Sequence, residues 1–454
     1  EQQKLQKGDD SLPSLRHAPP LEERLTWKDF KVKQELGRGT FGKVWLVERE
    51  NNLFAMKVMT KKKVFQEKML FHVRLEREIL ATVGRHQPFV VDLHASFQTK
   101  NALFFVMKYL SGGSLFHHLR ESPKPFTKQQ AIFYAAEIVC ALECLHQADF
   151  IYRDMKLENC LLDGQGHICL ADFGLSRRIT PKLRRVKSFS GSNIYVAPEV
   201  LSDEGDGHGK SVDWWGFGVL LHLLLTQQAP FWSDSNEELF RMIKEGDDPD
   251  FSSYTFLDAD SIDLLKNLLV RDPTKRLGYN PQELGASGAQ QIKAHKFFES
   301  IEWDKVVAKQ YTPPIVPDAD YAITRASVGD TDGLDDINNI EGTLDDDGSG
   351  DAIFLENFYF DPSMDPQTSD APTTSSSSVA AASSSSEPSP ALSLLCKICG
   401  KNVDFDQVDQ HSLTCQIDNG QSDDQDDAQN DAQNDDTPDA DDAPDAQNDD
   451  QDDG

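Results

Sequence analysis

The sequence lacks the long apolar segments that carry a protein into or across a membrane. No run of 18 apolar residues occurs, and the first residues show no succession of charged, apolar and small side chains of the signal-peptide kind. Cysteine is also scarce, with seven among the 454 residues. Their arrangement is unlike the disulfide framework of a secreted protein. We therefore expect a soluble protein without a membrane span, located in the cytoplasm or the nucleus.

Positive charge is nearly absent from the last third of the chain. Residues 321–454 carry 33 acidic side chains and three basic ones, whereas the charges before them almost balance. Binding to nucleic-acid phosphates requires clustered Lys and Arg, so this tail argues against a nucleic-acid partner. Residues 417–454 also have too few apolar side chains to offset the entropy of folding, and we expect them to be disordered.

The composition divides the chain into segments. Short runs that alternate apolar and polar residues, such as 54–59, occupy 27–110 and predict an antiparallel sheet. Residues 111–299 contain apolar stripes at helical spacing, such as 129–148 and 211–225. Together they predict an α+β domain with a β-rich lobe followed by a larger helical lobe. The other predicted segments are a flexible leader (1–26), a tail (300–361), a Ser/Ala/Pro linker (362–393), a small finger (394–416) and an acidic tail (417–454).

A glycine-rich run separates two strand-like segments. It begins at Leu36 and ends at Val44, and its glycines are Gly37, Gly39 and Gly42. Glycines at this spacing let a hairpin bring its backbone N–H groups close to phosphate oxygens. Such a triplet is, by itself, equally consistent with an ordinary turn.

A lysine and a glutamate follow this run. Lys57 lies in a strand-like segment 15 residues after Gly42, and Glu76 lies in a segment with helical character. A Lys–Glu pair is able to hold an ammonium group against nucleotide phosphates, although two solvated surface charges are the alternative interpretation.

Two further motifs favour the functional interpretation. The segment Ile-Tyr-Arg-Asp154-Met-Lys156-Leu-Glu-Asn159 is followed, 18 residues after Asp154, by Asp172-Phe-Gly. With these motifs in this order, the sequence resembles the protein kinases. The resemblance implies a bilobal kinase fold and magnesium-dependent transfer of phosphate from ATP to Ser or Thr hydroxyls of protein substrates. It implies that Asp154 orients the hydroxyl and takes its proton, that Lys156 contacts the transferring phosphate, and that Asn159 and Asp172 bind Mg²⁺.

The same resemblance implies where the nucleotide binds. Met107 stands at the gatekeeper position, and Lys108 to Leu110 form the hinge between the lobes. The glycines, Lys57 and Glu76 would hold the phosphates. The apolar residues expected around the base are Leu36, Val44, Ala55 and Leu161.

Other segments indicate the branch of the family. Gly166–Asp172 and Pro313–Pro317 resemble the AGC Ser/Thr kinases, nearest the protein kinase C and Akt side. In this comparison Glu199 and Arg276 form a pair and Asp213 anchors the catalytic loop, so all three are structural residues.

Some positions depart from the AGC pattern. Only Glu158 stands clearly where basophilic relatives bind substrate arginines, because Ser114 and Leu223 occupy two other positions that are usually acidic. The sequence therefore predicts at most a mild preference for basic substrates.

The resemblance also implies a regulatory phosphate. Ser188 is at the activation-loop phosphosite position, Arg153 would receive the phosphate, and an upstream activating kinase is the implied partner. A later aromatic group, at Phe354 and 358–360, resembles part of the AGC tail, and an unrelated aromatic anchor is the alternative.

A second constellation lies near the C-terminus. Cys396 and Cys399 are separated by two residues, and His411 and Cys415 by three, which is the ligand spacing of a tetrahedral zinc site. Zinc would stabilise this small segment by on the order of 10 kcal/mol. The segment resembles ubiquitin-binding zinc fingers, although Leu413 replaces their usual acidic residue. Ubiquitin is thus one candidate partner, and a purely structural or other protein-binding zinc finger is the alternative.

Two other function classes compete with the kinase. A pseudokinase scaffold would bind nucleotide and recruit partners through the finger and tail, but non-catalytic relatives commonly lose one of Lys57, Asp154, Asn159 and Asp172, and all four are present. A nucleic-acid factor built on the finger is disfavoured by the acidic tail.

Overall fold

The computed structural model describes residues 24–39, 42–180, 185–186, 193–202, 207–285, 287–318, 321–325, 358–361, 393–395 and 402–404. The chain divides into two units, 1–387 and 388–454, which are described separately. None of the helices in the described ranges is both long enough and apolar enough to cross a bilayer.

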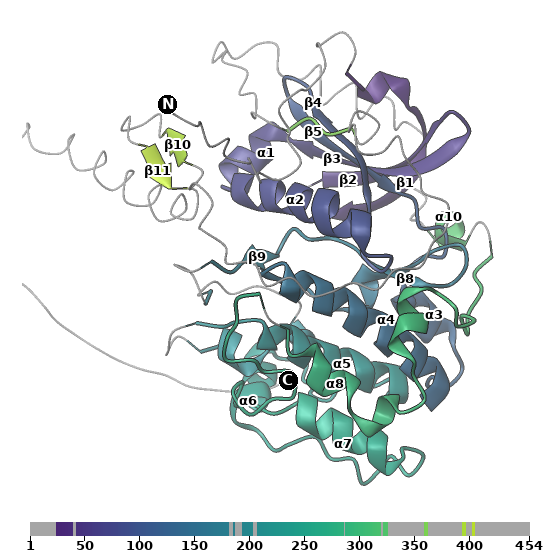
Figure 1. Cartoon of the computed structure of the whole chain (residues 1–454), viewed down its shortest axis with the longest axis vertical. Coiled ribbons are helices and arrows are strands. Elements are labelled where there is room, and N and C mark those ends of the chain that lie inside the picture. The colour runs from purple at the N-terminus through teal and green to yellow at the C-terminus, as the bar shows by residue number, and fades with distance from the viewer. Residues whose placement is uncertain are drawn as a thin grey trace, which may run out of the picture. The chain divides into compact units, whose positions relative to one another are not determined.

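The smaller lobe is built on a five-stranded antiparallel sheet with strand order β1-β2-β3-β5-β4. One face carries a cluster that includes Trp27, Phe30 and Trp45, and helix α2 crosses the sheet (Figure 1). This sheet confirms the alternating pattern of the sequence. The elements are β1 (Lys31–Gly39), β2 (Gly42–Arg49), β3 (Asn52–Thr60), α1 (Lys61–Gln66), α2 (Leu70–His86), β4 (Leu93–Gln98) and β5 (Ala102–Lys108).

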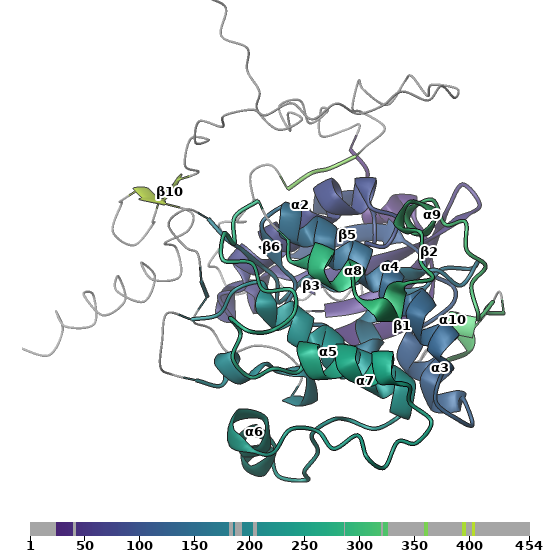
Figure 2. The same ribbon diagram turned by 60° about the horizontal axis from the view of Figure 1, so that its bottom comes forward.

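The larger lobe is helical. Nearly every residue of α5 is buried, and α4 and α7 pack against it (Figure 2). Helix α4 begins at a capping box in which Thr127 accepts a hydrogen bond from the Gln130 amide. The helices are α3 (Leu115–Glu121), α4 (Lys128–Gln147), α5 (Ser211–Thr226), α6 (Asn236–Glu245), α7 (Ala259–Leu268), α8 (Ala289–Lys293), α9 (Trp303–Val307) and α10 (Tyr321–Arg325).

Short strands and turns carry the loops that follow α4. Strand β6 (Phe150–Ile151) pairs with β9 (Arg177–Arg178), and β7 (Cys160–Leu162) pairs with β8 (Ile168–Leu170). The 3₁₀ turns are η2 (Trp27–Asp29), η3 (Leu157–Asn159), η4 (Asn193–Tyr195), η5 (Pro198–Val200) and η6 (Lys296–Phe298). In the second unit, β10 (Ser393–Leu395) pairs antiparallel with β11 (Asn402–Asp404). The bilobal architecture predicted from the sequence is thus confirmed for the first unit.

Candidate active site

A buried ion cluster joins the two lobes. Lys57 of β3 donates to Glu76 of α2 at 2.6 Å and to Asp172, which follows β8, at 3.2 Å. Lys57 and Glu76 are nearly inaccessible, whereas the Asp172 side chain is 44% exposed. Burial alone would lower the pKa of Lys57, but the carboxylates of Asp172 and Glu76 outweigh it and raise the pKa. Lys57 in turn lowers the pKa of Asp172. The cluster therefore holds a permanent cation next to an accessible carboxylate.

Two residues near this cluster adopt left-handed backbone conformations that side chains disfavour. Arg153 has φ +65° and Asp172 has φ +55°. Asp172 Oδ1 accepts a hydrogen bond from the Gly174 amide at 3.4 Å. Strain of this kind persists only where the surrounding structure enforces it, and it is commonest at functional sites.

Asp154 is held by its neighbours through one carboxylate oxygen. Its Oδ2 accepts from Lys156 Nζ at 2.6 Å and from Asn159 Nδ2 at 2.7 Å. Asn159 Nδ2 also donates to the Asp154 carbonyl at 3.0 Å. The other oxygen, Oδ1, is buried and has no hydrogen-bond partner within the described part of the chain. An acceptor oriented in this way can receive a hydrogen bond from a substrate hydroxyl.

The loop that carries Asp154 is fixed to the core of the larger lobe. Asp213 of α5 accepts from the backbone amides of Tyr152 at 2.9 Å and Arg153 at 2.7 Å, and His146 lies 2.7 Å from the same carboxylate. Asp213 is 1% exposed. The structure also contains the expected Arg276–Glu199 pair, with two N···O distances of 2.6 and 2.8 Å.

The apolar residues expected around a nucleotide base come from both lobes. Ala55 and Met107 are direct partners across β3 and β5, and Val44 of β2 is opposite Lys57. From the larger lobe, Leu161 forms a bridge with Ser114. Along the chain that links the lobes, Leu110 is buried and Lys108 is exposed, 4.0 Å from Asp163. Leu36 in β1 is half-buried.

The glycines of the β1–β2 hairpin differ in their surroundings. A Cβ on Gly37 would meet no atom of the described residues within 4 Å, whereas one on Gly42 would lie 1.9 Å from the Val58 carbonyl oxygen. Gly39 pairs with Gly42 at the end of the hairpin, and the two turn residues are outside the described ranges. Strand packing therefore requires a glycine at position 42, whereas no contact in the described part of the chain requires one at position 37.

A second arginine and a neutral histidine lie near Arg153. His72 of α2 and Arg177 of β9 are hydrogen bonded to each other, and Arg153 donates to the Leu175 carbonyl at 2.8 Å. Burial lowers the pKa of His72 to about 3, and Arg177 and Arg153 contribute to the shift. Burial and Arg177 likewise lower the pKa of Arg153. This cluster would be stabilised by an added anion. Ser188 lies outside the described residues.

Sequence reasoning identified Arg153 but missed the other members of this cluster. One available signal was the position of His72, four residues before Glu76, because residues at that spacing share a helix face. His208 was also missed. Its backbone exchanges two hydrogen bonds with Val186, both at 2.9 Å, and its buried Nε2 has no partner among the described residues.

Of the three positions expected to contact basic substrate side chains, only one carries a carboxylate. Glu158 is exposed and Leu223 is half-buried. Ser114 directly precedes α3, and its hydroxyl lies 3.3 Å from His117 Nδ1. His117 thus stands beside a position that is usually acidic in AGC relatives.

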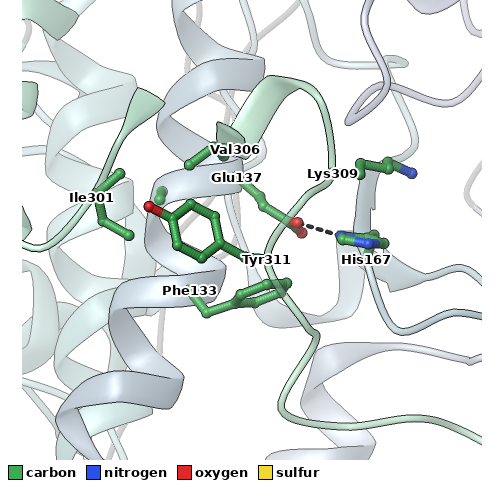
Figure 3. Close-up of a pocket in the computed structure, with 8 residues that line it drawn as sticks. Phe133, Glu137, His167, Ile301, Val306, Lys309 and Tyr311 are labelled. Atoms are coloured by element: carbon green, nitrogen blue, oxygen red, sulfur yellow. Dashed lines mark hydrogen bonds and ion pairs between the residues drawn. The ribbon is translucent and has the colours of Figure 1, made fainter. Parts of the chain in front are cut away.

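A small cavity lies between α4, β8 and the segment around α9 (Figure 3). Glu137 and His167 meet at its wall, 2.6 Å apart, and Glu137 also accepts from the Ile168 amide at 2.8 Å. None of its lining residues belongs to the predicted site. The predicted zinc ligands Cys396, Cys399, His411 and Cys415 lie outside the described residues.

Known proteins resemble this chain over about two thirds of its length. A family model described as "Protein kinase domain" matches residues 30–298, more than half of the chain. The RAC family serine/threonine-protein kinase homolog of Dictyostelium discoideum is 41% identical over 303 residues, which are 66% of this chain and 64% of that protein. The cAMP-dependent protein kinase catalytic subunit of the same organism is 38% identical over 304 residues, covering 66% and 44%.

Serine/threonine-protein kinase gad8 of Schizosaccharomyces pombe is 40% identical over 309 residues, covering 68% of this chain and 52% of that protein. The matched part is thus less than two thirds of each of these relatives.

Proposed function

The chain belongs to the protein kinase family and, within it, to the AGC Ser/Thr kinases, and we propose that it transfers the γ-phosphoryl group of ATP to Ser or Thr hydroxyls of protein substrates. The observation that supports this most directly is that a buried lysine held by two carboxylates occurs together with a separate aspartate that has an available acceptor oxygen. Lys57 is paired with Glu76 and Asp172, and Asp154 offers a buried acceptor without a partner in the described chain.

The residues around Lys57 and Asp154 fit a magnesium nucleotide. Magnesium takes one or two protein carboxylates and completes its shell with phosphate and water oxygens. Asp172 would supply the carboxylate, and Asn159 would supply its amide oxygen because its amide nitrogen already donates to Asp154. The open space at Gly37 permits close approach of phosphates. Bound ATP would supply the phosphoryl group, with Lys57 against its phosphates.

The proposed chemistry relies on fixed charges. Asp154 Oδ1 would orient the substrate hydroxyl and take its proton. Lys156, whose Nζ donates to Oδ2 of the same carboxylate at 2.6 Å, would neutralise charge on the transferring phosphoryl group. Because backbone hydrogen bonds to Asp213 fix this loop, little reorganisation is needed at the moment of transfer.

The proposed substrates are proteins, and we expect the kinase to have at most a mild preference for basic residues before the phosphoacceptor. Glu158 is the exposed carboxylate that supports this preference. Ser114, Leu223 and the nearby His117 provide no further negative charge, so a second arginine would gain little. A strict requirement for two upstream arginines would contradict this part of the proposal.

The proposed switch is phosphorylation of Ser188 by an upstream kinase. A phosphate would bring about −1.5 to −2 charges and three acceptor oxygens. The adjacent cations Arg153 and Arg177 support this proposal, because an anion would relieve their mutual repulsion. The neutral His72 of α2, which is hydrogen bonded to Arg177, would then link α2 to the catalytic loop. The Ser188→Ala variant should therefore keep only the low activity of the dephosphorylated enzyme.

The proposed finger binds one zinc ion through Cys396, Cys399, His411 and Cys415, and ubiquitin is its candidate partner. The proposal rests on ligand spacing, and one structural fact agrees with it. Strands β10 and β11 pair on either side of residues 396–401, the segment that contains the two closely spaced cysteines.

The proposed activity is tested on a randomised Ser/Thr peptide array with the full chain, ATP and Mg²⁺. We expect phosphate incorporation that disappears when magnesium is chelated and in the Asp172→Asn variant. Asp250→Asn, at an exposed aspartate outside the site, is the matched control and should retain activity. ATP binding without any incorporation by the wild-type chain would favour the scaffold interpretation.

A further inference from the structure

Residues 358–361 extend the sheet of the smaller lobe at its edge. Strand β4 is the edge strand, and its Ser96 exchanges two backbone hydrogen bonds with Phe360, at 3.0 and 2.9 Å. Ser96 Oγ also donates to the Phe358 carbonyl at 2.6 Å. The short green segment beside β4 and β5 in Figure 1 is this addition. A distant part of the chain thus docks as a short edge strand.

Successive side chains of this segment enter different clusters. Phe358 is 2% exposed and stacks on Phe105 of β5, with ring centroids 5.5 Å apart. It belongs to the cluster that also contains the buried face of α2. Tyr359 packs instead against the cluster around Trp27 on the sheet, together with Leu25.

The N-terminal end of the described chain holds Tyr359 in place. The Leu25 amide donates to the Tyr359 hydroxyl at 3.2 Å, across 334 positions of sequence. The Arg24 guanidinium lies 5.3 Å from the centroid of the same ring, within the range of a cation–π contact. The hydroxyl in turn lies 3.5 Å from the Asp361 carboxylate.

We infer that Arg24 and Leu25 form a clasp on Tyr359 that keeps residues 358–361 docked and thereby helps to position α2. A strand this short is marginally stable on its own. Contacts from a second segment therefore shift the balance toward the docked state.

The effect reaches the active site through Phe105. This residue is the direct cross-strand partner of Lys57, so Phe358 packs on the strand next to the one that carries the buried lysine. Undocking removes an aromatic ring from the hydrophobic core cluster that also includes the buried side chains of α2, the helix that holds Glu76. Arg24 and Tyr359 are therefore positioning residues that act through α2.

The docked state is measured by hydrogen exchange of the Ser96 and Phe360 amides in the full chain, because each is bonded to the other residue's carbonyl. Arg24→Ala should speed exchange at both amides by about 2- to 5-fold, which is the change expected from loss of one exposed cation–π contact. Arg24→Lys should restore slow exchange because it keeps the cation. Unchanged exchange in Arg24→Ala would overturn the clasp.

A matched pair of hydroxyl deletions separates this clasp from general effects. Tyr359→Phe should speed exchange at the two amides by about 2- to 10-fold through loss of the bond from Leu25. Tyr311→Phe removes a hydroxyl that accepts from the Glu302 amide at 2.9 Å, and it should leave both amides unchanged. Equal effects of the two variants would overturn the assignment.

The positioning role has its own readout. In Arg24→Ala, exchange of the α2 amides should increase and KM for ATP should rise more than kcat falls, with recovery in Arg24→Lys. If the Ser96 and Phe360 amides respond while α2 and KM do not, the positioning role is overturned. The exchange measurements do not depend on phosphoryl transfer, so failure of the proposed activity is distinguishable from failure of the clasp.

Discussion

Replacing Lys57 by Met tests how the buried ion cluster contributes to stability. The variant keeps the length of the side chain but leaves Glu76, which is 2% exposed, without its partner at 2.6 Å. Removing one partner of a buried pair costs about 3 to 5 kcal/mol. At about 2 to 4 °C per kcal/mol, the melting temperature at pH 8 should fall by roughly 10 °C. Asp172 contributes less to this loss because it is 44% exposed and remains hydrated.

The sign of the pH dependence separates this mechanism from simple loss of packing. Burial raises the pKa of Glu76, and in the variant the opposing charge of Lys57 is gone. A raised folded-state pKa favours the protonated carboxyl in the folded chain. The stability of Lys57→Met should therefore be regained as the pH falls from 8 to 5 and lost again as it rises.

Thermal unfolding followed by circular dichroism at both pH values provides the measurement. The double variant Lys57→Met/Glu76→Met should recover most of the loss at pH 8, because an apolar pair of similar volume replaces a buried ion pair at little cost. A wild-type melting temperature for Lys57→Met at pH 8 would refute the reasoning, as would a double variant that is as unstable as the single one.

Three other predictions concern the hairpin, the buried histidine His208 near Arg153, and the finger. In urea unfolding, Gly42→Ala should lower the free energy of unfolding by about 1 to 3 kcal/mol, because its Cβ would lie 1.9 Å from the Val58 carbonyl oxygen. Gly37→Ala should change the free energy of unfolding by less than about 0.5 kcal/mol and should raise KM for ATP. Burial and Arg153 lower the pKa of His208 to about 4, so the unfolded chain binds a proton at this imidazole more readily than the folded chain does. As the pH falls from 7 to 5, this group should lower the free energy of unfolding of the wild type by about 2 kcal/mol, and the loss should be absent in His208→Asn. Cys399→Ser should release one zinc ion per chain, measured by elemental analysis, while kinase activity is retained.

Elements with strong periodicity were predictable to within a residue or so. The apolar stripe at 129–148 corresponds to α4, which spans 128–147, and the stripe at 211–225 corresponds to α5, which spans 211–226. Both helices are buried along most of their length, so the pattern of apolar residues dominates their boundaries. The strand run at 54–59 lies inside β3 for the same reason.

The parts of the site that sequence reasoning missed are those joined only by tertiary contacts. His72 and Arg177 meet although 105 positions separate them, and neither belongs to a motif that carries the family resemblance. The docking of Phe358 on Phe105 was similarly invisible, because the spacing of the aromatic residues gives no information about which edge of a sheet they reach.

The most direct test of the account is kcat for peptide phosphorylation by the wild-type chain and by Asp154→Asn, with ATP affinity measured in parallel. The variant removes the carboxylate that would take the hydroxyl proton and keeps the shape of the side chain. We predict that kcat falls by about 10²- to 10⁴-fold while the Kd for ATP changes little. Equal kcat values for the two proteins, or nucleotide binding by the wild type with no phosphoryl transfer, would contradict the proposed function.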